Sequence, residues 1–349
     1  MKSLLPLLFV FLIAFSCNNV KEAPALSEQH GGILRINMPY LPKTLFPPGV
    51  NDVVASQLVS QIHAGLVKFG ASNTAIFPSV ARRWKIDSTE SIFTFTLRNN
   101  AFFCNNPCFK DGKGRKIVAE DVKFSLELLC FQNMDNNNFN LVSNIKGAKK
   151  HFEESACSKP EKGVEGIKVL NDSTIEISLE KPNPMFLNFL ANPVCAIQAK
   201  EAIEKYGTAN LIGAGSFTAT EMPAPGKMMV LKRSENYFLQ NNQNKPLPML
   251  DEIHISFTES ASKEIINFMN GELDLIIGLS QCEAQGIAEK YIEGLKMKPP
   301  KYILNSVPDS NVHLFNLQYP YVKDFYTNSM NYLDLSIVYF NKTDSLVKK

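Results

Sequence analysis

Apolar and polar residues alternate in several short segments, and each such segment predicts a strand with one buried face. Phe93, Phe95 and Leu97 alternate with two threonines and an arginine, which is the period of a half-buried antiparallel strand. Further strands are predicted at 33–37, 167–169, 175–179, 230–232 and 253–257. The segments 167–169 and 175–179 flank an Asn-Asp turn, so they predict a hairpin.

Apolar residues that recur every three or four positions predict four helices between these strands. The first has apolar positions at 54, 58, 62 and 66, a cap at Asn51 or Asp52, and its end at Gly70. The others begin at about Ala119, cover 200–206 before Gly207, and cover 261–270 between Ser260 and Gly271. Because strands and helices are intermixed, the fold class is α/β or α+β rather than all-β.

Composition and charge mainly exclude functions. The 349 residues include 36 Lys+Arg and 34 Asp+Glu, which leaves a net charge of +2. This balance argues against a broad basic surface, so no nucleic-acid partner is predicted. The length is typical of about two domains.

The N-terminus reads as a targeting segment. A short basic start is followed by an apolar run at 4–15, which is too short to span a bilayer permanently. The run ends in Ala14-Phe15-Ser16-Cys17, which resembles a bacterial lipobox. This resemblance implies a signal peptide at 1–16, lipid on Cys17 and a polar tether at 17–32. The alternative is ordinary signal cleavage, with Cys17 an incidental thiol.

The six remaining cysteines permit disulfides if the chain is exported. We expect a pair among Cys104, Cys108 and Cys130. A zinc site is the alternative for Cys104 and Cys108, but no second close pair of ligands accompanies them. The sequence therefore predicts no metal.

The residue patterns that support catalysis are missing from the sequence. The five histidines are scattered, and no HExxH, GxSxG or Walker A motif occurs. The segment 213–217 has the glycines of a dinucleotide loop but reads as a tight turn, and the basic segment 112–116 reads as a solvated loop rather than a phosphate cradle. We predict neither an enzyme nor a cofactor.

Seven segments, in one order, resemble signatures of the family 5 extracellular solute-binding proteins, which are the peptide-binding and related subunits of ABC importers. They are FPSVARRW at 77–84, FTFTLR at 93–98, AEDVKFSL at 119–126, KPNPMF at 181–186, GAGSF at 213–217, LDEI at 250–253 and MNGELD at 269–274. The chain departs from the family pattern at four positions. Ala214 and Ser216 replace Thr and Pro, Phe46 replaces an Asp, and Val118 replaces a Thr that would cap the helix at Ala119.

The resemblance implies an α/β fold of the periplasmic-binding-protein-like class, type II, with two lobes that close on a ligand. The first lobe is expected at 33–279, with an extra subdomain at about 70–167. Residues 280–349 are expected to begin a second lobe that remains incomplete, so the chain reads as truncated at its C-terminus. The second-lobe carboxylate that pairs with a peptide's amino terminus matches no position here.

The resemblance also implies a function. A lipoprotein on the periplasmic side of a membrane, inner or outer, would capture peptides or a related small solute between the lobes and deliver them to ABC permease subunits. The alternative is a surface or adaptor lipoprotein without a transport role, which uses the lobe as a scaffold. The expected ligand contacts lie on two loops: Tyr40, Leu41 and Phe46 on one, and Gly213, Gly215 and Phe217 on the other.

Overall fold

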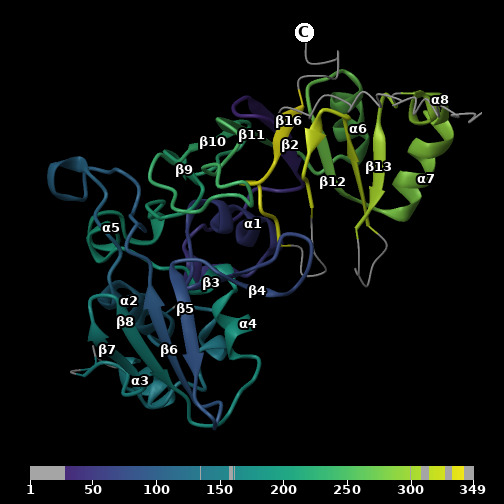
Figure 1. The fold of residues 1–349 in the computed structure, drawn as a ribbon. Helices are drawn as coiled ribbons and strands as arrows, with labels where there is room; N and C mark the ends of the chain where they lie inside the picture. Colours follow the sequence, from purple (N-terminus) through teal and green to yellow (C-terminus); the bar gives the residue numbers. More distant parts are fainter. Residues whose placement is uncertain are drawn as a thin grey trace, which may run out of the picture.

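The largest element is a mixed seven-stranded sheet with the order β13-β14-β12-β2-β11-β10-β9 (Figure 1). In the computed structural model, the described residues are 28–133, 135–156, 160, 162–298, 300–307, 314–326 and 332–341. The strands are β2 Ile33–Met38, β9 Phe217–Ala219, β10 Met229–Arg233, β11 Glu252–Phe257, β12 Leu275–Leu279, β13 Ile303–Ser306 and β14 Phe315–Gln318. β2 runs parallel to β11 and to β12, and the other neighbours are antiparallel.

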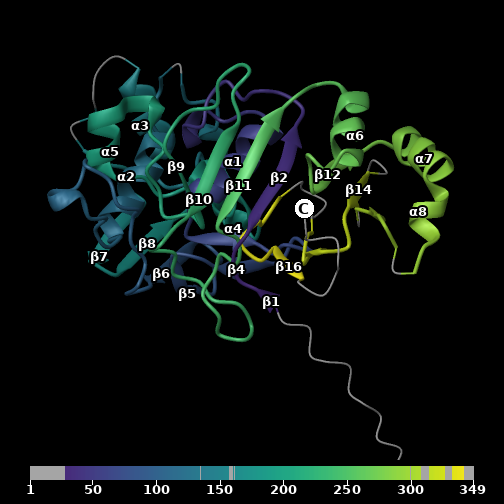
Figure 2. The same cartoon turned by 90° about the horizontal axis from the view of Figure 1, so that it is seen from above.

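Helices lie against both halves of this sheet. Seen from above, β10, β11, β2 and β12 lie side by side, with α6, α7 and α8 beyond β12 (Figure 2). These helices are α6 Ala261–Met269, α7 Gln281–Lys290 and α8 Ile292–Lys296, and α1 Val53–Ile62 packs in the main core. The prediction of Ser260 as the cap of α6 is confirmed, since its side chain accepts a hydrogen bond from the Lys263 backbone N–H.

The first predicted helix is too long. Asp52 caps α1 as expected, but the helix ends at Ile62 rather than near Gly70. Leu66 is buried just before a short strand, β3 Val67–Phe69, which pairs with β4 Ile76–Pro78. Leu66 therefore matches the spacing of the helix, but its side chain reaches the core from a backbone that is not helical.

The subdomain has a four-stranded antiparallel sheet with the order β5-β6-β8-β7. Its elements are β5 Ala81–Ile86, β6 Ile92–Leu97, β7 Ile167–Asn171, β8 Thr174–Ser178, α2 Ala119–Leu129 and α3 Ala148–Ser155. The predicted strand at 93–97 and the predicted hairpin are confirmed. Because β8 lies between β6 and β7, the subdomain continues to Ser178 instead of ending at about 167.

The remaining helical elements are short. They are the helices α4 Phe186–Leu190 and α5 Lys200–Tyr206 and the 3-10 turns Pro47–Gly49, Lys110–Gly112, Phe139–Leu141, Pro193–Cys195 and Gly207–Ala209. The subdomain lies at one end of the molecule, and α7 and α8 lie at the other (Figure 1).

Residues 332–341, which we call the C-terminal segment, pack into the N-terminal core. Leu333, Leu335 and Val338 are fully buried in it, and the Asp334 carboxylate lies 2.7 Å from Lys68 Nζ. The segment ends in β16 Tyr339–Asn341, which pairs with β1 Glu28–Gln29 and β15 Val322–Lys323. The expected tether therefore contains a strand at its C-terminal end.

The expected division at residue 280 also differs from the structure. β13 and β14 extend the main sheet, and the C-terminal segment belongs to the N-terminal core. A second, smaller core lies between this end of the sheet and its helices, and it is rich in tyrosine; its buried members are Phe268, Leu273, Ile276, Leu279, Ile287, Tyr302, Leu317 and Tyr319. The predicted signal peptide and Cys17 lie outside the described residues. Within the described ranges, no helix has the length and apolar character needed to cross a membrane.

Candidate functional site

The candidate site lies at the loop and helix that follow β2, the first of the parallel strands. Met38 and Phe257 are partners at the carboxyl ends of β2 and β11, and the Asn37 amide donates to the Thr258 carbonyl at 3.1 Å. Ligands of open α/β sheets bind outside the carboxyl ends of parallel strands. The loop after β2 leads from this edge to the first turn of α1.

A hollow of about 320 Å³ opens beside the N-terminus of α1. Five parts of the chain line it: the start of α1, β3, the segment around residue 138, the segment around residue 192, and the C-terminal segment. The lining residues are Val50, Asn51, Asp52, Val53, Ser56, Gln57, Phe69, Asn138, Asn192, Pro193, Val194 and Tyr332. Amide and carboxylate side chains dominate its polar surface, so it can hydrogen-bond to the main chain of a peptide.

Tyr40 and Asp52 determine the electrostatics next to this hollow. Asp52 Oδ1 accepts from the Ala55 backbone N–H at 2.8 Å, which satisfies one free donor of the helix. Tyr40 is 37% exposed. Burial raises the pKa of the Tyr40 hydroxyl, and the neighbouring Asp52 carboxylate raises it further. The pair therefore presents a neutral phenol and one negative charge.

Two asparagines hold the walls in place. Asn138 donates its amide to the carbonyls of Pro48 and Val50 at 3.0 and 2.7 Å, which ties the subdomain to the loop before α1. Asn192 Oδ1 accepts from the Val194 backbone N–H at 3.1 Å. Sequence patterns did not single out either residue or Tyr332, because each reaches the site through contacts between distant segments.

The structure does not bring the six expected contact residues into one site. Tyr40 and the half-buried Leu41 lie at the N-terminal end of α1, whereas Phe46 and Phe217 are buried in the core. Gly213 and Gly215 lie at the other end of α1, a helix about 15 Å long. The Gly215 N–H donates to the Ile62 carbonyl at 2.9 Å, and the Gly213 carbonyl accepts from Cys104 at 2.8 Å.

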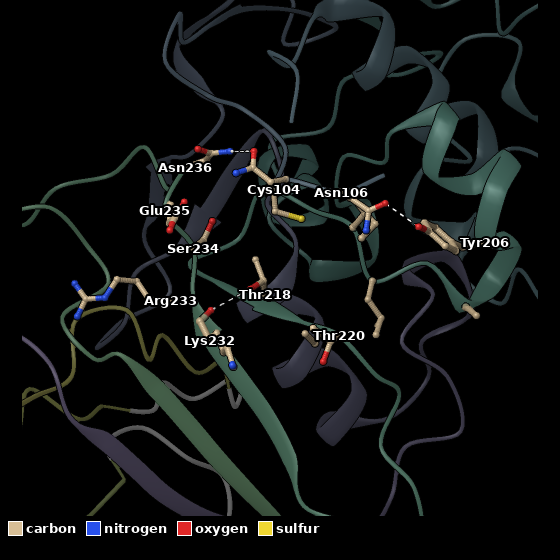
Figure 3. Close-up of a pocket in the computed structure, with 15 residues that line it drawn as sticks. Cys104, Asn106, Tyr206, Thr218, Thr220, Lys232, Arg233, Ser234, Glu235 and Asn236 are labelled. Atoms are coloured by element: carbon tan, nitrogen blue, oxygen red, sulfur yellow. Dashed lines mark hydrogen bonds between the residues drawn. The ribbon is translucent and has the colours of Figure 1, made fainter. Parts of the chain in front are cut away.

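Residues 213–217, which we call the glycine turn, border a different hollow of about 430 Å³ between the subdomain and β9–β10 (Figure 3). Many of its polar groups are already paired with protein. Tyr206 donates to Asn106 at 2.8 Å (Figure 3). Asn236 donates to the Phe103 carbonyl at 3.0 Å. The hollow at the N-terminus of α1 is the better candidate for a ligand site, because the loop after β2 connects it to the carboxyl edge of the parallel strands.

The expected disulfide among Cys104, Cys108 and Cys130 is not formed, because all three carry free thiols. Cys130 ends α2 and is fully buried, and burial raises the pKa of its thiol. Cys104 lies instead on the loop that borders the hollow of Figure 3.

Comparison with known proteins identifies the family. The mixed α/β fold is that of periplasmic peptide-binding proteins. Residues 75–324 match the model of the bacterial extracellular solute-binding proteins, family 5 Middle, and the chain belongs to this family. The resemblance drawn from the seven segments is therefore confirmed.

Two curated relatives are dipeptide-binding proteins. DppE of Bacillus subtilis is 23% identical over 249 residues, which cover 69% of this chain and 42% of the relative. The dipeptide-binding protein of Escherichia coli is 27% identical over 219 residues, which cover 60% of this chain and 38% of the relative. The chain thus spans less than half the length of these two relatives.

Solved structures agree in fold. The oligopeptide-binding protein OppAIV of Borrelia burgdorferi has a TM-score of 0.63 and 25% identity, covering 79% of this chain and 51% of its own. Haemophilus influenzae OppA, in complex with RPPGFSPFR, has a TM-score of 0.65 and 18% identity, covering 81% of this chain and 51% of its own.

Proposed function

We propose that the chain is the substrate-binding component of an ABC importer and that it captures peptides or a related small solute. Family membership supports the transport role, and the names of the relatives support peptides as the solute class. The proposal assigns no catalytic role. The partners would be ABC permease subunits on the periplasmic side of a membrane, with Cys17 as the lipid anchor.

The observation that carries the proposal is the polar hollow at the N-terminus of α1. Asp52 supplies a negative charge that suits a peptide ammonium, and the surrounding amides suit main-chain N–H and C=O groups. Tyr40 and Leu41 border the same end of α1 and would contact the ligand. Recognition through the main chain tolerates many peptide sequences.

Peptide-dependent stabilisation tests the proposal. The chain from residue 18 onward is heated with and without trialanine, and the peptide should raise the unfolding temperature. Asp52→Asn keeps a capping oxygen but removes the charge, so it should weaken peptide binding about five- to ten-fold in calorimetry.

Val53 is 47% exposed at the hollow, so Val53→Trp should block binding. Ile292→Trp is the matched control, because Ile292 is 44% exposed on α8. Absence of any peptide effect, together with specific capture of a protein partner, would favour the adaptor lipoprotein instead.

A further inference from the structure

A larger hollow lies on the other side of Phe69 from the proposed peptide site. It has a volume of about 570 Å³ and is enclosed by β3 and β4, the 239–249 loop and the C-terminal segment. This volume is within the range of small-molecule pockets. Phe69 lines both this hollow and the one at α1, where its ring contacts Tyr332 edge-on at 5.9 Å between centroids. The two hollows therefore share a wall and have otherwise different linings.

One cation in the larger hollow is neutralised. Lys68 Nζ lies 2.7 Å from an Asp334 carboxylate oxygen, and the Asp334 side chain is only 8% exposed. Asp334 also accepts from the Ser336 backbone N–H at 3.1 Å. Its charge and hydrogen bonds are thus already taken up by protein groups.

The guanidinium of Arg98 differs from Lys68 because no carboxylate pairs with it in the part of the chain that the structure describes. Its Nε donates to the Ser79 carbonyl at 2.6 Å, and its Cζ lies 5.9 Å from the centre of the Phe238 ring. Burial lowers the pKa of Arg98, and the nearby Arg82 also lowers it. With Nε bonded to the carbonyl, the two Nη groups are left to face an anion.

The remaining walls are largely apolar. Phe77 and Tyr326 are each 45% exposed at the hollow, and aliphatic side chains continue the surface between them: Leu239, Leu247, Met249 and Ile337. Exposed aromatic rings beside a cation suit a ligand that has both an apolar body and an anionic group. Of the two cations that line the hollow, Lys68 is paired with Asp334, so Arg98 offers one positive charge that suits one carboxylate.

We propose that this hollow is a second binding site, which takes a small organic monocarboxylic acid. The carboxylate pairs with the Nη groups of Arg98, and the apolar or aromatic body packs against Phe77, Leu239 and Tyr326. The site is separate from the proposed peptide site and does not depend on it.

The test is calorimetric titration of the purified chain from residue 18 onward, at neutral pH, with 3-phenylpropionate and with its neutral amide. The acid should bind saturably at concentrations up to about 10 mM, and the amide should bind at least about ten-fold more weakly. Arg98→Gln should weaken binding of the acid about ten-fold. Arg82→Gln removes a neighbouring charge that does not line the hollow, and it should change the affinity less than about two-fold.

A second variant guards against loss of folding in Arg98→Gln. Asn242 is exposed at the rim, so Asn242→Trp should obstruct the hollow without disturbing the core, and the unfolding temperature of each variant is measured alongside. Equal binding of acid and amide, full binding by folded Asn242→Trp, or displacement by inorganic phosphate as effective as by the acid would each overturn the proposal. Val53→Trp obstructs the peptide site and leaves the larger hollow open. If this variant lost acid binding while Asn242→Trp kept it, the acid would bind at the peptide site and the proposal would be overturned.

Discussion

The Lys68–Asp334 ion pair joins two residues far apart in the sequence within a buried environment. Burial alone would raise the pKa of Asp334, but Lys68 and Ser336 hold it below its ordinary value. Asp334 therefore contributes stability above the carboxyl's unfolded pKa of about 4, and this contribution is lost as the pH falls through the lower folded value.

Asp334→Asn should lower the free energy of unfolding by about 3–5 kcal/mol, because it leaves the Lys68 ammonium buried without a partner. Urea unfolding at neutral pH measures this. The exposed pair Lys150–Glu154, at 3.7 Å, is the control, and Glu154→Gln should change stability by less than about 0.5 kcal/mol. Equal effects of the two substitutions would contradict a buried pair. The double variant Lys68→Met with Asp334→Leu should recover much of the loss.

Glu264 gives stability the opposite pH dependence. Burial raises its pKa to about 7, and the Glu283 carboxylate adds to this, while a hydrogen bond with Asn37 opposes it. The folded state holds this proton more tightly than the unfolded state, so stability falls as the pH rises from about 4.5 through 7. Glu264→Gln should raise the free energy of unfolding at about pH 8 by about 1–3 kcal/mol and have little effect at about pH 4. The exposed Glu272→Gln is the control, and equal pH profiles of wild type and Glu264→Gln would refute the assignment.

At the scale of elements, the backbone of the glycine turn packs closely against the C-terminal end of α1. A Cβ on Gly215 would lie 2.1 Å from the Gln61 carbonyl oxygen, and one on Gly213 would lie 2.3 Å from that of Ile62. Gly215→Ala should therefore lower the free energy of unfolding by about 1–3 kcal/mol. Gly286→Ala in α7 is the matched control: its Cβ meets open space, and the change should stabilise by up to about 1 kcal/mol. Stable Gly215→Ala protein that binds peptide less tightly would show that the turn belongs to the ligand site after all.

Most elements could be predicted from sequence because their patterns are local. The alternation at Phe93–Leu97 and the Ser260 cap each report the position of a single element. The end of α1 could not be predicted, because an apolar residue at position 66 is compatible both with a longer helix and with a loop that enters the core. The sequence predicted Asp52 as a cap of α1 and placed ligand contacts on the loop at Tyr40, but it did not indicate Asn138, Asn192 or Tyr332. Asn138 bonds to a carbonyl 88 residues away, and Tyr332 contacts Phe69 across more than 200 residues, so neither contact leaves a periodic signal.

At the scale of the molecule, one core joins both ends of the described chain. The Gln61 side chain donates to the Leu333 carbonyl at 2.7 Å and accepts from the Leu335 backbone N–H at 3.1 Å. Leu335→Ala should lower the free energy of unfolding by about 2–5 kcal/mol and speed hydrogen exchange at α1. Ile287→Ala, in the second core, is the comparison, and it should leave exchange at α1 less affected. Unchanged exchange at α1 in Leu335→Ala would contradict a shared core.

The position of the C-terminal segment also sets the order of events during synthesis. α1 and β3 emerge from the ribosome early, but the side chains that cover them, Leu333, Leu335 and Val338, are made more than 250 residues later. The first core therefore stays open until almost all the described chain has been translated, and its closure requires contacts of long sequence separation, which form slowly.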